Sequence, residues 1–294
     1  MLIALIVVFS IWTPSFFSFV NLTNVALQSS ILLMIALPMT LIVMSEGIDL
    51  SVGSTASLVG VVFALVTLGT GSVALAVVTA VLAGVLVGLI NGWIVAFCEL
   101  PPFVVTLATL GIVQGASLLI AEGQVTNGLP SVAHWLYDGI FLGLPTPVVG
   151  AALAYVIFHW LLYHTRFGGY VFALGGNREA LHVSGVGIRR WLVIAYALGG
   201  TLAAVAGLIL AARIDGGQPT AAAGMEFDAV AAVVVGGTSF EKGKGSLPGT
   251  LLGVIAVGVL KNGLNLGSVA SAMQVTMIGL FVILAVLVDG ARRA

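Results

Sequence analysis

The chain has 294 residues, of which 60% are hydrophobic and 7% are charged, and its formal net charge is −1. Soluble domains carry about 25% charged residues, so this composition excludes a water-solvated globular protein and indicates a polytopic membrane protein. The balanced charge gives no indication of nucleic-acid binding, and the single cysteine, Cys98, excludes an intrachain disulfide.

Ten apolar segments, taken in chain order, are predicted to be membrane helices because most approach the ~20 residues that span a hydrocarbon core. They cover residues 1–13, 25–45, 50–69, 72–97, 101–121, 145–163, 191–212, 226–237, 246–266 and 270–289. Segments 1–13 and 226–237 are short, so we expect truncated, re-entrant or broken helices whose backbone is covered by protein or water. The predicted fold class is all-α, with a single transmembrane domain over residues 1–294.

The distribution of basic residues predicts how these helices are oriented. No Lys or Arg occurs before the segment 166–190, which then carries four of the ten basic residues. Short basic loops stay on the cytoplasmic side of a membrane, so we place 166–190, 238–245 and the carboxyl end inside. The loop 122–144 lacks Lys and Arg and is placed outside. Arg213 and Lys261 fall at predicted outer ends, where we expect their side chains to reach the interface.

Glycine is abundant, with 38 residues in the chain, and it recurs on single helix faces. Small residues let membrane helices approach closely, so the following positions predict helix contacts: Gly84, Gly88, Gly92, Gly199, Gly200 and Gly207. Segments 84–95 and 253–264 also resemble each other, since each carries Asn-Gly on a glycine-rich helix. Transporters often contain such repeats with the substrate site between them, and the alternative is chance similarity.

The segment 166–190 has the pattern of a short, capped helix outside the membrane. A Gly-Gly pair at 175–176 ends the preceding structure, Asn177 is a favourable N-cap, and Glu179 adds negative charge to the first turn. Gly185 is predicted to be the C-terminal cap, with about two helical turns before it. Such a helix could bind a cytoplasmic partner, or it could lie as an amphipathic helix on lipid headgroups.

Three acids, Asp49, Glu226 and Asp228, lie beside or within apolar segments. An intramembrane acid is a candidate functional group, and a proton-coupled carrier could use Glu226 and Asp228 as a relay. The alternatives are local. Asp49 would accept a backbone amide as the cap of the next helix, and the other two acids would complement a helix dipole.

Passage of a polyhydroxylated solute requires polar side chains within the membrane. The candidates for the translocation path are Asp49, Asn91, Thr106, Gln114 and Asn262. Hydrogen bonds between helices explain the polar uncharged residues equally well. The four histidines have no metal-ligand spacing with a carboxylate partner, so no metal site is predicted. The loop 237–246 lacks the spacing of a P-loop, and no pattern indicates a catalytic residue.

Five stretches resemble, in the same order, the permease subunit of bacterial ATP-binding-cassette sugar importers, the family of ribose, xylose, arabinose and autoinducer-2 permeases. They are GIDLSVGS (47–54), PPFVVTLATL (101–110), TRFGGYVFALGGNREALHVSGV (165–186), EFDAVAAVVVGGTSFEKGKGSLPGTLLG (226–253) and NGLNLGSV (262–269). The resemblance extends over essentially the whole chain, and the ribose-type branch fits best.

The resemblance implies a pore-forming subunit that is not itself an enzyme. Two such permeases, identical or paralogous, form the translocation path in the bacterial inner membrane. Two cytoplasmic ATPase subunits, which hold ATP and Mg²⁺, drive alternating access, and a periplasmic or extracellular binding protein delivers a monosaccharide or similar polyol. No cofactor is implied in this chain.

The pattern GGN-x-x-A-x-x-x-SG resembles the loop that couples such a permease to its ATPase. It maps onto Gly175, Gly176, Asn177, Ala180, Ser184 and Gly185, with Arg178 and Glu179 between them. Two other classes of transporter remain as alternatives. One is an amino-acid permease of another ATP-binding-cassette branch, and the other is an ion-coupled carrier that depends on Asp49 or Asp228 and works without an ATPase.

Overall fold

The computed structural model describes residues 2–177, 181, 183–239 and 243–293, and this part of the chain is almost entirely helical. Its helices are α1 (Leu2–Trp12), α2 (Phe19–Met44), α3 (Val52–Thr70), α4 (Val73–Phe97), α5 (Pro102–Ile120), α6 (Ser131–Asp138), α7 (Thr146–His164), α8 (Arg166–Gly176), α10 (Ile188–Arg213), α11 (Met225–Val235), α12 (Leu247–Leu266) and α13 (Ser271–Arg293). Each of the ten predicted membrane segments corresponds to one of these helices. Among the described residues, seven helices are long and apolar enough to cross a membrane, namely α2, α3, α4, α5, α7, α10 and α12.

Two helices lie where the sequence was predicted to form loops. The helix α6 lies within 122–144, and α8 occupies the first part of 166–190. In α8 the side chains of Phe167, Val171 and Leu174 are buried, because their spacing places them on one face of a helix. The basic segment therefore packs on the bundle before the chain reaches the predicted coupling residues.

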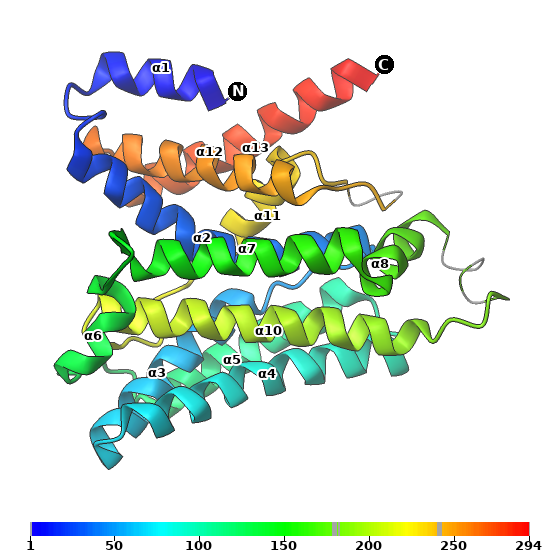
Figure 1. Ribbon diagram of the computed structural model, residues 1–294, viewed down its shortest axis with the longest axis horizontal. Coiled ribbons are helices and arrows are strands. Elements are labelled where there is room, and N and C mark those ends of the chain that lie inside the picture. Colours follow the sequence, from blue (N-terminus) through cyan, green and yellow to red (C-terminus); the bar gives the residue numbers. More distant parts are fainter. Residues whose placement is uncertain (1, 178–180, 182, 240–242, 294) are drawn as a thin grey trace.

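The long helices lie side by side along the longest axis of the molecule, so the connecting segments gather at two opposite ends (Figure 1). One end holds α6, the carboxyl ends of α10 and α12, and two short antiparallel strand pairs. These pairs are β1 (Thr126–Asn127) with β4 (Gly216–Gly217), and β2 (Ile140–Phe141) with β3 (Leu144–Pro145). The other end holds α8 and the start of α10. The basic segments thus lie opposite the loop 122–144, as the charge distribution predicted.

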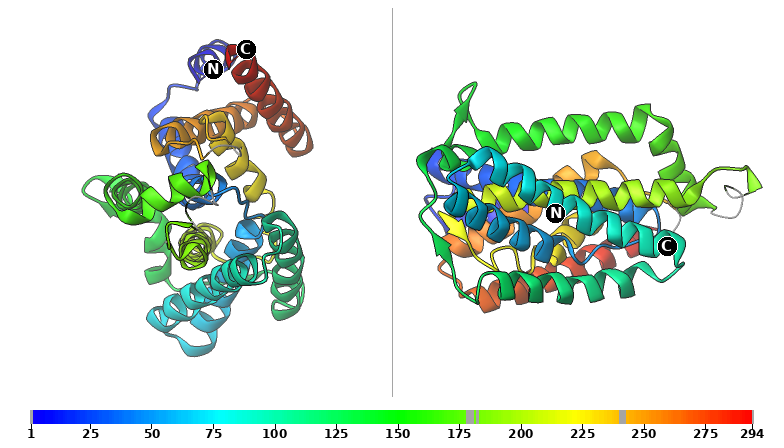
Figure 2. Two further views of the ribbon diagram at one scale, coloured as in Figure 1. Left: turned by 90° about the vertical axis from the view of Figure 1, so that its right-hand side faces the viewer. Right: turned by 90° about the horizontal axis from the view of Figure 1, so that it is seen from below.

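The chain contains two runs of helices with the same organisation. Each run begins with a 26-residue helix, α2 or α10, continues through an irregular segment, 45–51 or 214–224, and ends with three helices. The first helices of the two runs point in opposite directions along the long axis (Figure 1). In the end-on view of Figure 2, α5 and α13 lie on the same side of the bundle, one in each half. The similar segments 84–95 and 253–264 belong to α4 and α12, which hold the same place in the two runs.

The helices α4 and α10 pack with their backbones almost in contact. A methyl group would overlap atoms across this contact at Gly84, Gly88, Gly92 and Gly200, and at Gly207 it would overlap the backbone of Ala56 in α3. A Cβ on Gly88, for example, would meet the carbonyl oxygen of Tyr196 and lie 3.1 Å from the Cα of Ala197. Gly199 is the exception, since its nearest neighbour, the Ile42 side chain, would lie at an ordinary distance of 3.4 Å. Glycine therefore sets the distance between these two helices.

Candidate functional site

The predicted coupling segment begins where α8 ends. The backbone N–H of Asn177 donates to the carbonyl oxygen of Ala173 at 2.9 Å and closes the last turn of α8 at Gly175 and Gly176. Asn177 then has an extended backbone, and its carbonyl oxygen accepts the N–H of Leu181 at 3.2 Å. Asn177 therefore has the extended backbone that was predicted for an N-cap residue. Three further predicted coupling residues, Arg178, Glu179 and Ala180, lie outside the described residues.

The far side of this segment, as far as the structure describes it, combines a buried leucine with exposed residues. Leu181 is buried in a small apolar cluster with Leu174, Ile188 and other residues of α4 and α10. Ser184 and Gly185 are exposed. Gly185 has a φ of +76°, the left-handed conformation predicted for a C-terminal cap, and no atom lies within 4 Å of where its Cβ would be. Ser184 and Gly185 are therefore accessible to a partner, while Leu181 packs against the bundle.

A close backbone contact ties this segment to the second loop at the basic end. A Cβ on Gly175 would overlap the carbonyl oxygen of Met44 and the Cα of Gly243. Gly243 itself has a left-handed φ of +57°. The end of α2, the end of α8 and the loop 238–245 therefore meet directly, so a displacement of one loop would press on the other.

An ion pair links the first turn of α10 to the connection between α4 and α5. The Nη2 atom of Arg189 lies 2.8 Å from Oε1 of Glu99, and the guanidinium also lies 5.6 Å from the centre of the Phe97 ring. The two charged side chains are 55% and 65% exposed, so the pair contributes little to stability. The position of the pair is more informative than its strength. Arg189 lies four residues after Gly185 and Glu99 lies three residues before α5, so the pair connects the end of the predicted coupling segment to the start of α5.

The basic end also contains a cavity of about 710 Å³ between the ends of α2, α4 and α10 and the start of α5. Its walls include Glu46, Gly47, Glu99, Arg189 and Tyr196. The loop 45–47 thus reaches this cavity on one side and continues into the bundle toward Asp49 on the other.

A buried polar network surrounds the start of α3. The Oδ1 atom of Asp49 accepts hydrogen bonds from the backbone N–H of Ser51 at 2.9 Å and from its hydroxyl at 2.6 Å. The predicted bond to Ser51 is confirmed, but Ser51 rather than Asp49 is the N-cap of α3. Asn91 donates to the Ser51 hydroxyl at 2.8 Å and accepts from Thr109 at 2.7 Å. Thr106 donates to the carbonyl oxygen of Ile48 at 3.1 Å. These bonds fasten the irregular segment 45–51 to α4 and α5.

The other two predicted path residues make single contacts between distant segments. Gln114 donates to the carbonyl oxygen of Pro219 at 2.9 Å, and Asn262 donates to Oδ1 of Asn21 at 2.9 Å. Gln114 is partly exposed, and the other four predicted path residues are at most 4% exposed. Their contacts are those of inter-helix hydrogen bonds, and a role on the path stays a prediction.

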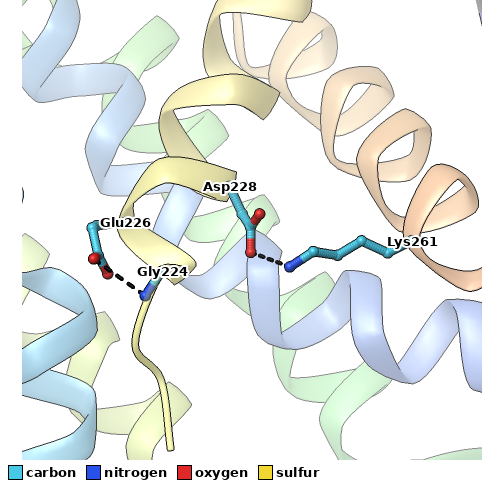
Figure 3. A network of polar contacts seen from close by, with 4 residues as sticks. All are labelled: Gly224, Glu226, Asp228 and Lys261. Carbon is cyan, nitrogen blue, oxygen red and sulfur yellow. Dashed lines mark hydrogen bonds and ion pairs between the residues drawn. The ribbon is translucent and has the colours of Figure 1, made fainter. Parts of the chain in front are cut away.

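A second acid and a lysine pair between α11 and α12, which the sequence did not predict. Figure 3 shows the ion pair between Asp228 and Lys261, with Glu226 turned the other way to accept the backbone N–H of Gly224 at 3.2 Å. A lysine within an apolar segment needs a partner. This requirement could have indicated from the sequence that Lys261 pairs with an acid. Among the described residues, no group of three or more His, Cys, Asp or Glu side chains lies close enough to hold a metal ion.

Comparison with known proteins assigns the chain to a transport family. A family described as the permease component of branched-chain amino acid transport systems matches residues 21–287. The chain belongs to this permease family. The ribose import permease of Escherichia coli strain K12 is 40% identical, over 99% of this chain and 92% of its own length. That of Bacillus subtilis strain 168 is 39% identical over 100% and 92%, and the D-allose permease of E. coli K12 is 31% identical over 97% and 88%. No solved structure matches.

These relatives confirm the resemblance to ribose-type permeases that the five sequence motifs indicated. The permease is a multi-pass protein of the inner membrane, and its relatives are transport proteins rather than enzymes. Membership of an importer family implies, in general, an ATPase and a binding protein as partners. The segment after α8 and the polar networks around α3 and α11 are the features in which a transport function can be sought.

Proposed function

We propose that this permease is the membrane-spanning subunit of an ATP-binding-cassette importer for a monosaccharide or similar small polyol. The observation that carries the proposal is its similarity, over almost the entire chain, to permeases named for ribose and for D-allose. The family description names branched-chain amino acids, but these full-length relatives are named for sugars. Since the two sugars differ, the similarity supports the class of substrate and not one compound.

The proposed coupling element is the segment Gly175–Gly185 at the basic end. Its capped and exposed geometry supports binding to a cytoplasmic ATPase, which would hold ATP and Mg²⁺ and carry out hydrolysis. This chain would need no cofactor of its own. A movement imposed on the segment would reach α10 through Leu181 and α2 through Gly175, because both residues are packed against those helices.

Transport would then proceed by alternating access in a pair of permeases, either two copies or a copy and a paralogue. The binding protein would deliver the sugar at the end that holds α6. ATP binding would close the ATPase subunits and move the coupling segments, and hydrolysis would reset the cycle. Asp49, Asn91, Thr106, Gln114 and Asn262 are proposed to lie on the translocation path and to respond to this movement. The last four bond to other segments, and Asp49 bonds Ser51, which Asn91 also contacts.

Co-purification tests the proposal directly. The permease is expressed with the ATPase and the binding protein encoded beside it, and ATP hydrolysis is measured in proteoliposomes with D-ribose, D-allose or L-leucine. Stimulation by one sugar together with its binding protein is the expected result. Stimulation by leucine alone would favour an amino-acid permease. Failure of any ATPase to associate, with uptake abolished when the proton gradient is collapsed, would favour an ion-coupled carrier.

A further inference from the structure

Arg213 and Lys261, which lie at predicted outer ends where the positive-inside rule does not expect basic residues, line the same cavity. Arg213 ends α10 and Lys261 lies in the last part of α12, both toward the end opposite the basic loops. Both residues line a cavity of about 280 Å³ between α2, α10, α11, α12 and α13. That volume is well above the ~10–15 Å³ that one water molecule requires, so the cavity can admit a small solute.

The cavity is lined by an unusual concentration of hydrogen-bonding side chains for a chain of this composition. They are Gln28, Arg213, Asp228, Lys261, Asn265 and Gln274. Arg213 and Asn265 are exposed, Gln28 and Lys261 are half-buried, and Asp228 is buried. The polar lining thus extends from an exposed rim to a buried base, as in a site that a solute enters from the outer side.

Several of these groups have hydrogen-bonding capacity that the described part of the chain does not use. Within that part, Gln28 makes no side-chain hydrogen bond, and Arg213 has only a ring contact with Tyr137. Asn265 accepts a bond from Gln274 through Oδ1, and its Nδ2 has no partner among the described residues. Asp228 uses Oδ2 for Lys261, and its Oδ1 likewise has none there. None of these atoms is among the buried side-chain atoms that lack a partner in the described part of the chain, so they are accessible in the cavity, and their free donors and acceptors point to a polar solute.

The corresponding region of the first run of helices behaves differently. There, Asp49 before α3 accepts two hydrogen bonds from Ser51 on Oδ1, and Asn91 is bonded at both ends of its amide. These residues are at most 1% exposed. The first network is buried and holds helices together, whereas the second lines a cavity. The two runs therefore differ in what their acids are placed to do.

We infer that the cavity formed by Gln28, Arg213, Asp228, Lys261 and Asn265 is a subsite for a polyhydroxylated solute at the outer end of the permease. A hydroxyl group both donates and accepts hydrogen bonds, so a polyol matches a lining that offers free donors and a free carboxylate oxygen together. A carboxylate would be attracted by Arg213, because Lys261 already neutralises Asp228, but it only accepts hydrogen bonds and would leave Oδ1 of Asp228 without a donor. The inference deepens the proposed function and rests on it, because it names where the imported sugar binds this chain.

Direct binding to the assembled permease–ATPase complex tests the subsite. The complex, without binding protein, is placed in lipid nanodiscs, and saturation-transfer NMR is recorded with D-ribose, D-allose and, as an anion probe, sodium acetate. We expect transfer to at least one sugar. In Gln28→Leu and Asn265→Leu the affinity should fall about threefold to tenfold, the effect of losing one hydrogen bond between neutral groups.

The control is Gln124→Leu, which removes the same type of side chain from an exposed position in the loop before α6. It should leave sugar binding unchanged. Neither test variant removes a partner of the Asp228–Lys261 ion pair. Because the two variants lie on different helices, the test remains valid if one of them fails to fold. Transfer to neither sugar, transfer to acetate alone, or equal affinity in all four proteins would overturn the subsite.

Uptake in proteoliposomes separates this inference from the proposed function. If the wild-type importer with its binding protein moves neither D-ribose nor D-allose, the proposed sugar function fails for these substrates and the subsite fails with it. If the wild type imports a sugar and both test variants import it at the same rate and affinity, only the subsite is wrong.

Discussion

The conformation of Gly185 provides the sharpest test of the coupling segment. Its φ of +76° lies in the left-handed region, and no atom lies within 4 Å of the position that a Cβ would take. A substitution at this position therefore changes the backbone preference without a packing clash. For an L-residue the left-handed conformation costs roughly 1–2 kcal/mol, and a β-branched residue is disfavoured further. Gly185→Val should therefore reduce the population of the capped conformation by a factor of about 5–30.

The functional consequence is measured as sugar imported per ATP hydrolysed in proteoliposomes. We expect Gly185→Val to insert into the membrane and purify normally but to lower this ratio at least fivefold, because the cap shapes the proposed contact with the ATPase. Gly185→Asn should retain most of the ratio, since asparagine tolerates left-handed backbone.

Gly169→Val is the matched control for this experiment. Gly169 is an exposed glycine of α8 that also has nothing within 4 Å of an added Cβ, but its backbone is helical rather than left-handed. It should therefore behave as wild type. A wild-type ratio in Gly185→Val, or equal loss in the Val and Asn variants, would refute the reasoning from backbone conformation.

Three further predictions concern packing, the ion pair and the buried network. Gly88→Leu should lower the free energy of unfolding by at least about 1–3 kcal/mol, because only backbone atoms could make room for the side chain. Its melting temperature in detergent should fall, whereas that of Gly69→Leu, which has open space around it, should not. Glu99→Arg and Arg189→Glu should each weaken coupling of ATP hydrolysis to uptake and the double variant should restore it; a double variant no better than either single one would contradict the link. Asn91→Leu should lower the free energy of unfolding by about 0.6–2 kcal/mol, because it removes two hydrogen bonds between segments. The same melting assay checks this, and an unchanged melting temperature would contradict a stabilising role of these bonds.

Much of the fold could be predicted because the rules of membrane insertion act on local sequence. Apolar length and helix breakers located all ten predicted segments, and the basic residues after residue 165 predicted which loops share an end. The short helix α8 was not predicted, although the spacing of Phe167, Val171 and Leu174 contained its signal. The left-handed cap at Gly185 was predicted for the same local reason, since glycine is the residue that adopts this conformation without strain.

The polar partners depended on tertiary structure. Asp228 and Lys261 are 33 residues apart, and Asn262 bonds to Asn21 across 241 residues, so no local rule joins them. The sequence by itself determined that the chain is a bundle of membrane helices, which loops share an end, and where a glycine-capped segment leaves the bundle, because hydrophobic length, basic charge and backbone preference are properties of short stretches. Only the tertiary structure decided that Arg213 and Lys261 line one cavity while Asp49 and Asn91 belong to a buried network, because that outcome depends on how helices far apart in the sequence pack against each other.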